Sequence, residues 1–279
     1  MADLSRAHML AVHHLLRDRR DFVALSPTWR RIHQAFELGE PDGKQLRFDD
    51  QQRRLLREQA QLAWGFDPLA GIPEGDRRTV AASAIDEKIA PERPDARFVL
   101  LKGRLPPPLP ELAPELSLRV PLDSIDPNGI TQILVIENLD SFDDWHAFVR
   151  PTELADALVL YRGHGGLARG TRRLLAGLSP HIPISVFPDW DPAGLFIAQT
   201  LPRADALLVP DLDQALLNKG SRAHFNRQHR ATAHLDRADL RDWSSLWETM
   251  KTHGLSIKQQ HMLALGTRLR RVMRNDMRR

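Results

Sequence analysis

Acidic side chains follow short apolar runs in the middle of this chain, at positions where they could act together. Glu137 directly follows Ile133–Ile136, and Asp189 and Asp191 come just after Ile182–Phe187. Short, continuous apolar runs are typical of strands that are buried on both faces of a parallel sheet. Because ligands bind at the carboxyl ends of such strands, we expect the three carboxylates to share one cleft.

Three carboxylates in one cleft repel one another and raise one another's pKa. A divalent cation removes that penalty, and Mg²⁺ binds few carboxylates while it keeps positions for water and phosphate oxygens. A glycine-rich turn, Arg162-Gly163-His164-Gly165-Gly166, follows the apolar run Ala157–Tyr161. Backbone N–H groups of such a turn can approach a phosphate closely, and Arg162 and His164 can contact it. The combination predicts phosphodiester chemistry assisted by Mg²⁺ or Mn²⁺.

Each of these residues also has a plain structural interpretation. Glu137 could simply solvate the turn at the end of its strand. Asp191 precedes Pro192, and Asp is a preferred N-cap residue while Pro suits the first helical position. Asp189 has no such capping role by its spacing, so it is the firmer candidate for a ligand. The glycines of the turn, Gly163 among them, could serve only a backbone with positive φ.

The elements that must position these residues form an alternating pattern. Ala206–Val209 is a fourth apolar run, and helical patterns lie between the runs at Leu167–Leu178 and Pro192–Leu201. Alternation of strands and helices at this spacing predicts a parallel, doubly wound α/β sheet over residues 128–213.

The two flanking regions differ from this middle part. Residues 1–127 begin with helical periodicity and end with two strand-like runs, Arg97–Leu101 and Leu116–Val120. This order suits a winged-helix-like α+β domain, or a small α+β domain without nucleic-acid contact. Residues 214–279 predict a basic helical extension, with amphipathic patterns at Leu240–Met250 and Ile257–Met273 and an Arg-rich end.

Composition excludes several classes of protein. The chain of 279 residues contains no Cys, which excludes disulfides, Cys-ligated zinc, iron–sulfur clusters and thiol nucleophiles. Its net charge is +3, and only six of its 39 basic residues are Lys. Arg suits phosphate contacts, but an Arg-rich composition also follows from a GC-rich genome. No apolar run approaches the roughly 20 residues of a membrane span, and no secretory signal is evident, so we expect a cytoplasmic protein without membrane contact.

Two motifs resemble those of the Toprim domain, which occurs in topoisomerases, bacterial primases and some nucleases. They are Val135-Ile136-Glu137-Asn138-Leu139 and Asp189-Trp190-Asp191-Pro192-Ala193-Gly194. The residues of these two motifs are most similar to those of the topoisomerase VI A subunit and of its relative JetD, the nuclease subunit of the Wadjet anti-plasmid systems. The resemblance covers roughly residues 130–213. It implies a Toprim fold, a Rossmann-like parallel sheet with flanking helices, behind an N-terminal winged-helix region.

One departure distinguishes this chain from topoisomerase VI. Enzymes of that type cut DNA with a Tyr in the N-terminal winged helix, whereas the only Tyr here is Tyr161, inside a predicted Toprim strand. The resemblance to JetD instead implies hydrolysis by metal-activated water. Glu137, Asp189 and Asp191 would then form the catalytic metal site for Mg²⁺ or Mn²⁺, in which the two aspartates hold the metal and Glu137 is a further ligand or the base that positions the attacking water. Arg162, Gly163 and His164 would contact DNA. It further implies a homodimer that acts on double-stranded DNA with an SMC-kleisin-type complex in plasmid or phage defence.

Two other hypotheses remain open at this point. The chain could be a non-catalytic DNA-binding or assembly subunit that retains a Toprim fold. It could also be a phosphotransferase of the haloacid dehalogenase type, which places Asp-x-Asp after a strand. That class is disfavoured because Ala193 stands where it usually has Thr or Val, and because Glu137 would have no role.

Overall fold

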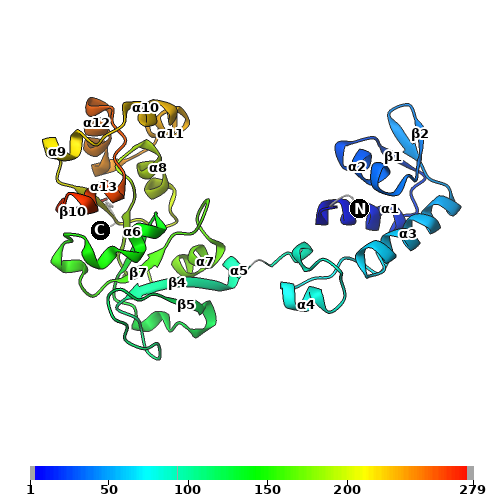
Figure 1. The fold of residues 1–279 in the computed structure, drawn as a ribbon, viewed down its shortest axis with the longest axis horizontal. Helices are drawn as coiled ribbons and strands as arrows, with labels where there is room; N and C mark the ends of the chain where they lie inside the picture. The colour runs from blue at the N-terminus through cyan, green and yellow to red at the C-terminus, as the bar shows by residue number, and fades with distance from the viewer. Residues whose placement is uncertain (1–3, 93, 275–279) are drawn as a thin grey trace. The chain divides into compact units, whose positions relative to one another are not determined.

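A computed structural model describes residues 4–92 and 94–274 of the chain. The chain divides into two compact units, Met1–Pro94 and Asp95–Arg279, here called the N-terminal unit and the α/β unit. Both are drawn in Figure 1.

The N-terminal unit combines helices with a small antiparallel sheet of order β1-β3-β2. Asp49 begins its longest helix, because its carboxylate accepts a hydrogen bond from the N–H of Gln52 at 2.7 Å. The core lies between helices and sheet and includes the fully buried Val12, Ile32 and Leu56. The elements are α1 (Arg6–Arg17), β1 (Phe22–Ala24), α2 (Pro27–Phe36), β2 (Glu40–Asp42), β3 (Gln45–Arg47), α3 (Asp50–Trp64) and α4 (Arg77–Ala81).

The α/β unit is built on a seven-stranded sheet of order β10-β9-β8-β6-β7-β4-β5. Its four middle strands, β9, β8, β6 and β7, run parallel, and β10, β4 and β5 pair antiparallel with their neighbours. The strands are β4 (Phe98–Gly103), β5 (Leu118–Pro121), β6 (Ile133–Ile136), β7 (Leu158–Tyr161), β8 (Ile184–Phe187), β9 (Ala206–Pro210) and β10 (Leu269–Met273). The sequence prediction of a parallel α/β sheet is confirmed by β6–β9, where every residue of β6 and β8 is buried.

Short helices connect and cover these strands. They are α5 (Pro94–Arg97), α6 (Leu139–Asp143), α7 (Arg169–Gly177), α8 (Pro192–Thr200), α9 (Gln214–Leu217), α10 (Arg222–Arg227), α11 (His229–Leu235), α12 (Ser244–His253) and α13 (Gln259–Ala264). Figure 1 shows α8, α10, α11 and α12 together in one part of the α/β unit, where α11 and α12 both pack against α8.

The boundary between the units differs from the predicted domain boundary at residue 127. The two strand-like runs expected to complete a winged helix are β4 and β5, and they belong to the large sheet instead. Leu101 of β4 pairs with Leu160 of β7, which would otherwise be an exposed apolar edge strand. Residues 95–127 therefore belong with the α/β unit, and the strands of the N-terminal unit are β1, β2 and β3.

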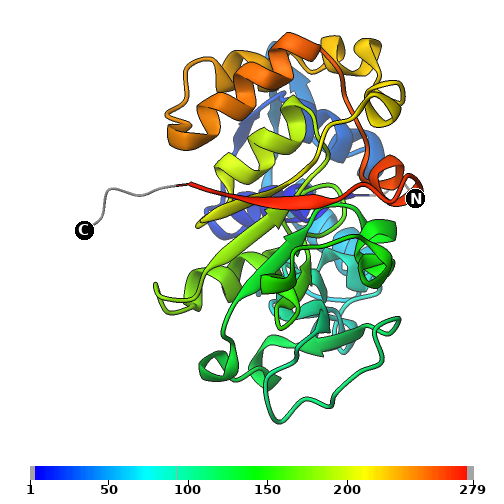
Figure 2. The same cartoon turned by 90° about the vertical axis from the view of Figure 1, so that its left-hand side faces the viewer.

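The C-terminal region departs in part from the prediction of a basic helical extension at 214–279: helices α9–α13 are present, but the region also contributes a strand. Its helices pack on the α/β unit, and the predicted helix Ile257–Met273 is wrong over its second half. Leu269–Met273 form β10, which pairs with β9 across its full length and is drawn in red in Figure 2. Pairing covers the open edge of β9, a gain that local periodicity does not encode. Arg278 and Arg279 lie outside the described residues.

Over residues 4–92 and 94–274, the structure contains no helix long and apolar enough to span a membrane.

Candidate functional site

Glu137 and Asp189 emerge from the carboxyl ends of two neighbouring parallel strands. Ile136 of β6 lies opposite Phe187 of β8, so the residues that follow are side by side. The N–H of Glu137 donates to the carbonyl oxygen of Phe187 at 3.1 Å, and the N–H of Asp189 donates to Oε2 of Glu137 at 3.2 Å. Strand register therefore brings the backbone of Asp189 into contact with the carboxylate of Glu137.

Asp191 is the most buried of the three, with 1 % of its surface exposed. Its Oδ1 accepts a hydrogen bond from the N–H of Gly194 at 2.9 Å, which makes it the N-cap of α8. Its Oδ2 accepts hydrogen bonds from Ser256 Oγ at 2.6 Å and Gln228 Nε2 at 2.9 Å. The capping role expected from the sequence is confirmed, and Asp191 also ties three distant segments together.

Gly194 permits this arrangement because the first turn of α8 passes very close to the preceding loop. A Cβ atom at residue 194 would lie 2.2 Å from the carbonyl oxygen of Asp189, well inside van der Waals contact. Any larger residue would push the helix start away from the loop that carries both aspartates.

Lys258 supplies a positive charge between the two aspartates. Its Nζ lies 2.8 Å from Oδ2 of Asp189 and 3.0 Å from Oδ2 of Asp191. Oδ1 of Asp189 accepts a further hydrogen bond from the N–H of Gln259 at 2.9 Å. The carboxylates of Asp189 and Asp191 are thus held by one lysine and by backbone and side-chain hydrogen-bond donors.

The segment that carries Lys258 is positioned by pairing with the aspartate loop itself. The N–H of Trp190 donates to the carbonyl oxygen of Ile257 at 2.9 Å, and the N–H of Ile257 donates back at 3.0 Å. The buried Gln259 donates from Nε2 to the carbonyl oxygen of Phe187 at 2.6 Å. These bonds bring residues 256–259 to the end of β8, some 70 positions away in the sequence.

The three carboxylates have different electrostatic environments. Burial, reinforced by the charge of Asp189, raises the pKa of Glu137 from 4.5 to about 7. Burial also raises the pKa of Asp189, although Lys258 opposes the rise. Burial alone would raise the pKa of Asp191 too, but the attraction of Lys258 and the hydrogen bonds outweigh it and lower that pKa. Negative charge is therefore compensated at Asp191 and under-compensated at Glu137.

The glycine-rich turn contributes Arg162 to this site. Arg162 NH2 lies 3.8 Å from Oε1 of Glu137, and its buried Nε has no hydrogen-bond partner among the described residues. Gly163 adopts φ +121°, and a Cβ there would lie 2.7 Å from Ala168. His164 is exposed, and within the described part of the chain it forms no hydrogen bond or ion pair. The turn thus aims Arg162, and not His164, at the carboxylates.

Sequence reasoning missed Lys258, Ser256 and Gln228. Their contact with Asp191 depends on segments more than 35 residues away, and no local periodicity signals it. Lys258 carried one usable signal: it is one of only six lysines in a chain that otherwise uses Arg.

A divalent cation fits two of the three predicted ligands. Across residues 4–92 and 94–274, no group of three or more His, Cys, Asp and Glu side chains is arranged to hold a metal ion. Asp191 does not fit as a direct ligand, since four donors already occupy its oxygens. Glu137 and Asp189 fit a hard cation better, because their half-buried side chains remain 19 % and 17 % exposed and because burial raises the pKa of both.

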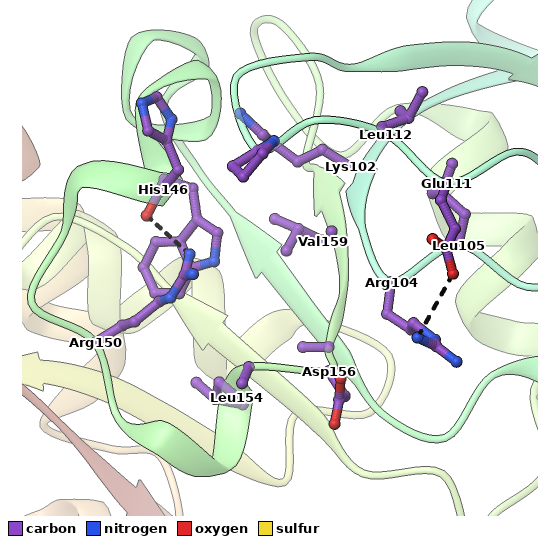
Figure 3. Close-up of a pocket in the computed structure, with 15 residues that line it drawn as sticks. Lys102, Arg104, Leu105, Glu111, Leu112, His146, Arg150, Leu154, Asp156 and Val159 are labelled. Carbon is purple, nitrogen blue, oxygen red and sulfur yellow. Dashed lines mark hydrogen bonds and ion pairs between the residues drawn. The ribbon is translucent and has the colours of Figure 1, made fainter.

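A separate cavity of about 270 Å³ lies beside β4 and β7. Figure 3 shows Lys102, His146 and Arg150 among its lining residues. Lys102 is 2 % exposed and donates to the carbonyl oxygen of Asp143, and burial lowers its pKa. None of the three carboxylates lines this cavity.

Comparison with known proteins agrees with the division of the chain. Residues 90–271 match a family described as a domain of unknown function, DUF7281. The chain belongs to this family. The match begins close to the boundary of the α/β unit at Asp95 and covers all of its strands except the end of β10. A comparison with curated proteins gave no match.

Proposed function

We propose that the α/β unit is a Toprim-type nuclease that hydrolyses phosphodiester bonds of double-stranded DNA with Mg²⁺ or Mn²⁺. The observation that carries the proposal is the contact between Glu137 and Asp189 at the ends of adjacent parallel strands, in a site short of positive charge. Such a site gains free energy by taking up a divalent cation together with a phosphate.

Glu137 and Asp189 would hold the cation, which supplies a polarised phosphate oxygen and an activated water. Asp191 would not touch the cation but would position the site, because it fixes the start of α8 and holds Lys258 in place. Arg162 lies beside Glu137 and Lys258 beside Asp189, and both would supply positive charge for the phosphate. Glu137, with its pKa near neutrality, is also suited to accept a proton from the attacking water.

The remaining parts of the proposal rest on the sequence motifs. They are the Toprim identity of the sheet, contacts of Gly163 and His164 with DNA, a homodimer, an SMC-kleisin-type partner complex and a cytoplasmic location.

A second candidate is a non-catalytic DNA-binding or assembly subunit. It is favoured by the way Lys258 bridges Asp189 and Asp191, since a lysine can neutralise these carboxylates without any metal. In that case the acidic site would be a structural centre that locks residues 256–259 onto β8.

A plasmid assay separates the two candidates. Purified full-length protein is incubated with supercoiled plasmid and Mn²⁺ or Mg²⁺, beside E137A, D189A and D156A. Asp156 is an exposed carboxylate that precedes β7, at the opposite edge of the sheet from the site, so it serves as the matched control. We expect cleavage by the wild type and D156A and none by the two site variants. Cleavage that survives in E137A and D189A would contradict the proposal. DNA binding without cleavage, and without calorimetric binding of Mn²⁺, would support the second candidate.

A further inference from the structure

The helices α10 and α11 carry an unusual concentration of basic side chains. Residues 221–237 contain four Arg and three His but a single acidic residue, Asp236. All seven basic side chains are exposed. They are Arg222, His224, Arg227, His229, Arg230, His234 and Arg237.

Most of this charge is not neutralised within the protein. Asp236 is already engaged, because it accepts a hydrogen bond from Trp247 and lies 3.6 Å from Lys251. Arg227, Arg230 and Arg237 form no ion pair or side-chain hydrogen bond with any described residue. Exposed arginines that lack a carboxylate partner remain available to an external anion.

Three of these side chains line one hollow. Arg230, His234 and Arg237 surround a cavity of about 400 Å³ whose remaining lining is Ala233 and Ala238. Their spacing of four and three residues places them on one face of α11 and of the turn after it. Leu235 points the other way and is 1 % exposed in the core. The small alanines leave room between the two arginines, as a phosphate group requires. We call Arg230, His234 and Arg237 the α11 basic face.

The α11 basic face is connected directly to the carboxylate site. Gln228, at the start of α11, donates to Oδ2 of Asp191 and accepts a hydrogen bond from the N–H of Ala193 at 2.7 Å. One and a half turns further on, His234 Nε2 lies 3.0 Å from Oε1 of Gln199. The pairs Ala193–Gln228 and Gln199–His234 are each 35 positions apart, so α11 runs parallel to α8 and away from the site. At 1.5 Å per residue, Arg230 and His234 lie about 3 Å and about 9 Å beyond Gln228 along the helix, and Arg237 follows in the turn after it.

We propose that the α11 basic face binds the sugar–phosphate backbone of duplex DNA and aligns it with the carboxylates. This inference rests on the proposed nuclease function and adds the surface that holds the substrate. Arginines bind phosphates in a bidentate manner, and backbone contacts of this kind fix position without reading sequence. An anionic membrane is a poorer partner, because membrane-bound amphipathic helices insert Trp, Phe or Leu, and Leu235 is buried in the core.

The test measures DNA binding by the full-length protein in EDTA, using fluorescence anisotropy of a labelled 20-base-pair duplex. The charge-reversal variant R230E/R237E is compared with R104E/R119E, which changes net charge equally. Arg104 and Arg119 are exposed and lie at β4 and β5, on the other edge of the sheet. We expect Kd to rise at least tenfold for R230E/R237E and less than twofold for the control. The slope of log Kd against log salt concentration should fall by about 2, since each phosphate contact contributes about 0.9. R230K/R237K should restore most of the affinity.

Equal losses of affinity in both charge-reversal variants would overturn the inference, because they would report net charge alone. An unchanged salt slope in R230E/R237E, or binding to phosphatidylserine vesicles and not to DNA, would also overturn it. Failure of the nuclease proposal has a different signature: wild type and E137A would bind DNA equally, neither would cleave plasmid, and R230E/R237E would still lose binding. Conversely, cleavage that needs Glu137 but is unaffected in R230E/R237E would leave the nuclease and exclude this surface.

Discussion

Replacing Glu137 by Gln should stabilise the protein at alkaline pH and have little effect near pH 4.5. Glu137 is only 19 % exposed at its side chain, and its pKa is raised from 4.5 to about 7 by burial and by Asp189. Between those two pH values the folded state binds a proton that the unfolded chain has released. Folding stability is therefore lost as pH rises through this range, and the full penalty is present above about pH 7.

The size of the penalty follows from the two pKa values. One pKa unit corresponds to about 1.4 kcal/mol, so a rise from 4.5 to about 7 places it at about 3 kcal/mol. Gln keeps an oxygen that can accept the hydrogen bond from the N–H of Asp189, but carries no charge. The E137Q variant should therefore be more stable than the wild type by about 2–3 kcal/mol at pH 8. Below pH 4.5 both proteins are uncharged at this position, and the difference should vanish.

Urea unfolding at pH 4.5, 6 and 8, followed by Trp fluorescence, measures this difference. The α/β unit contains four of the six Trp residues, so the signal reports mainly on that unit. The control is E153Q, at an exposed glutamate of the same unit, for which we expect no pH-dependent gain. The electrostatic account of this site would be refuted if E137Q were no more stable than the wild type at pH 8, or if its gain in stability were the same at all three pH values. Under the nuclease proposal, millimolar Mg²⁺ should stabilise the wild type at pH 8 and should not stabilise E137Q.

Three further predictions concern the supports of the site. Asp191→Ala should lower the free energy of unfolding by about 3–5 kcal/mol at pH 7, because it leaves three hydrogen-bond donors without their acceptor and Lys258 with Asp189 alone. Urea unfolding beside the exposed D156A measures this loss, and an equally small loss in both variants would contradict the prediction. Gly194→Ala should destabilise the protein by about 1–3 kcal/mol, the usual range for overpacking, because its Cβ would meet the carbonyl oxygen of Asp189 at 2.2 Å. The control is G177A, where a Cβ meets nothing within 4 Å. Equal thermal midpoints of the two variants would show that the loop relaxes freely. Lys102→Met should leave the free energy of unfolding at pH 7 unchanged or raise it by about 1 kcal/mol, because it removes a buried charge that has one carbonyl partner. If urea unfolding showed that the free energy of unfolding falls by more than about 2 kcal/mol, the hydrogen bond of Lys102 would be essential to the structure.

The sequence by itself determined the middle of the α/β sheet and its acidic edge. Continuous apolar runs identified β6, β7, β8 and β9, because a strand buried on both faces must be apolar at every position. Once these strands are parallel and β6 adjoins β8, Glu137 and Asp189 must meet at their carboxyl ends. The cap formed by Asp191 was equally visible, because capping depends on residues three positions apart.

Tertiary structure alone decided how the sheet is completed and how the carboxylates are neutralised. The strand-like run at Phe98–Gly103 could belong to a wing or to the large sheet, and only the open edge of β7 selects the sheet. Leu269–Met273 have helical periodicity, yet backbone pairing with β9 outweighs that preference. Lys258 reaches Asp189 and Asp191 across 67 to 69 residues, through pairing that no local pattern encodes. Local sequence determines which faces of a strand or helix are apolar and where helices begin. Long-range contacts depend instead on which strand edges remain unpaired and which buried charges remain without a partner once the sheet has formed.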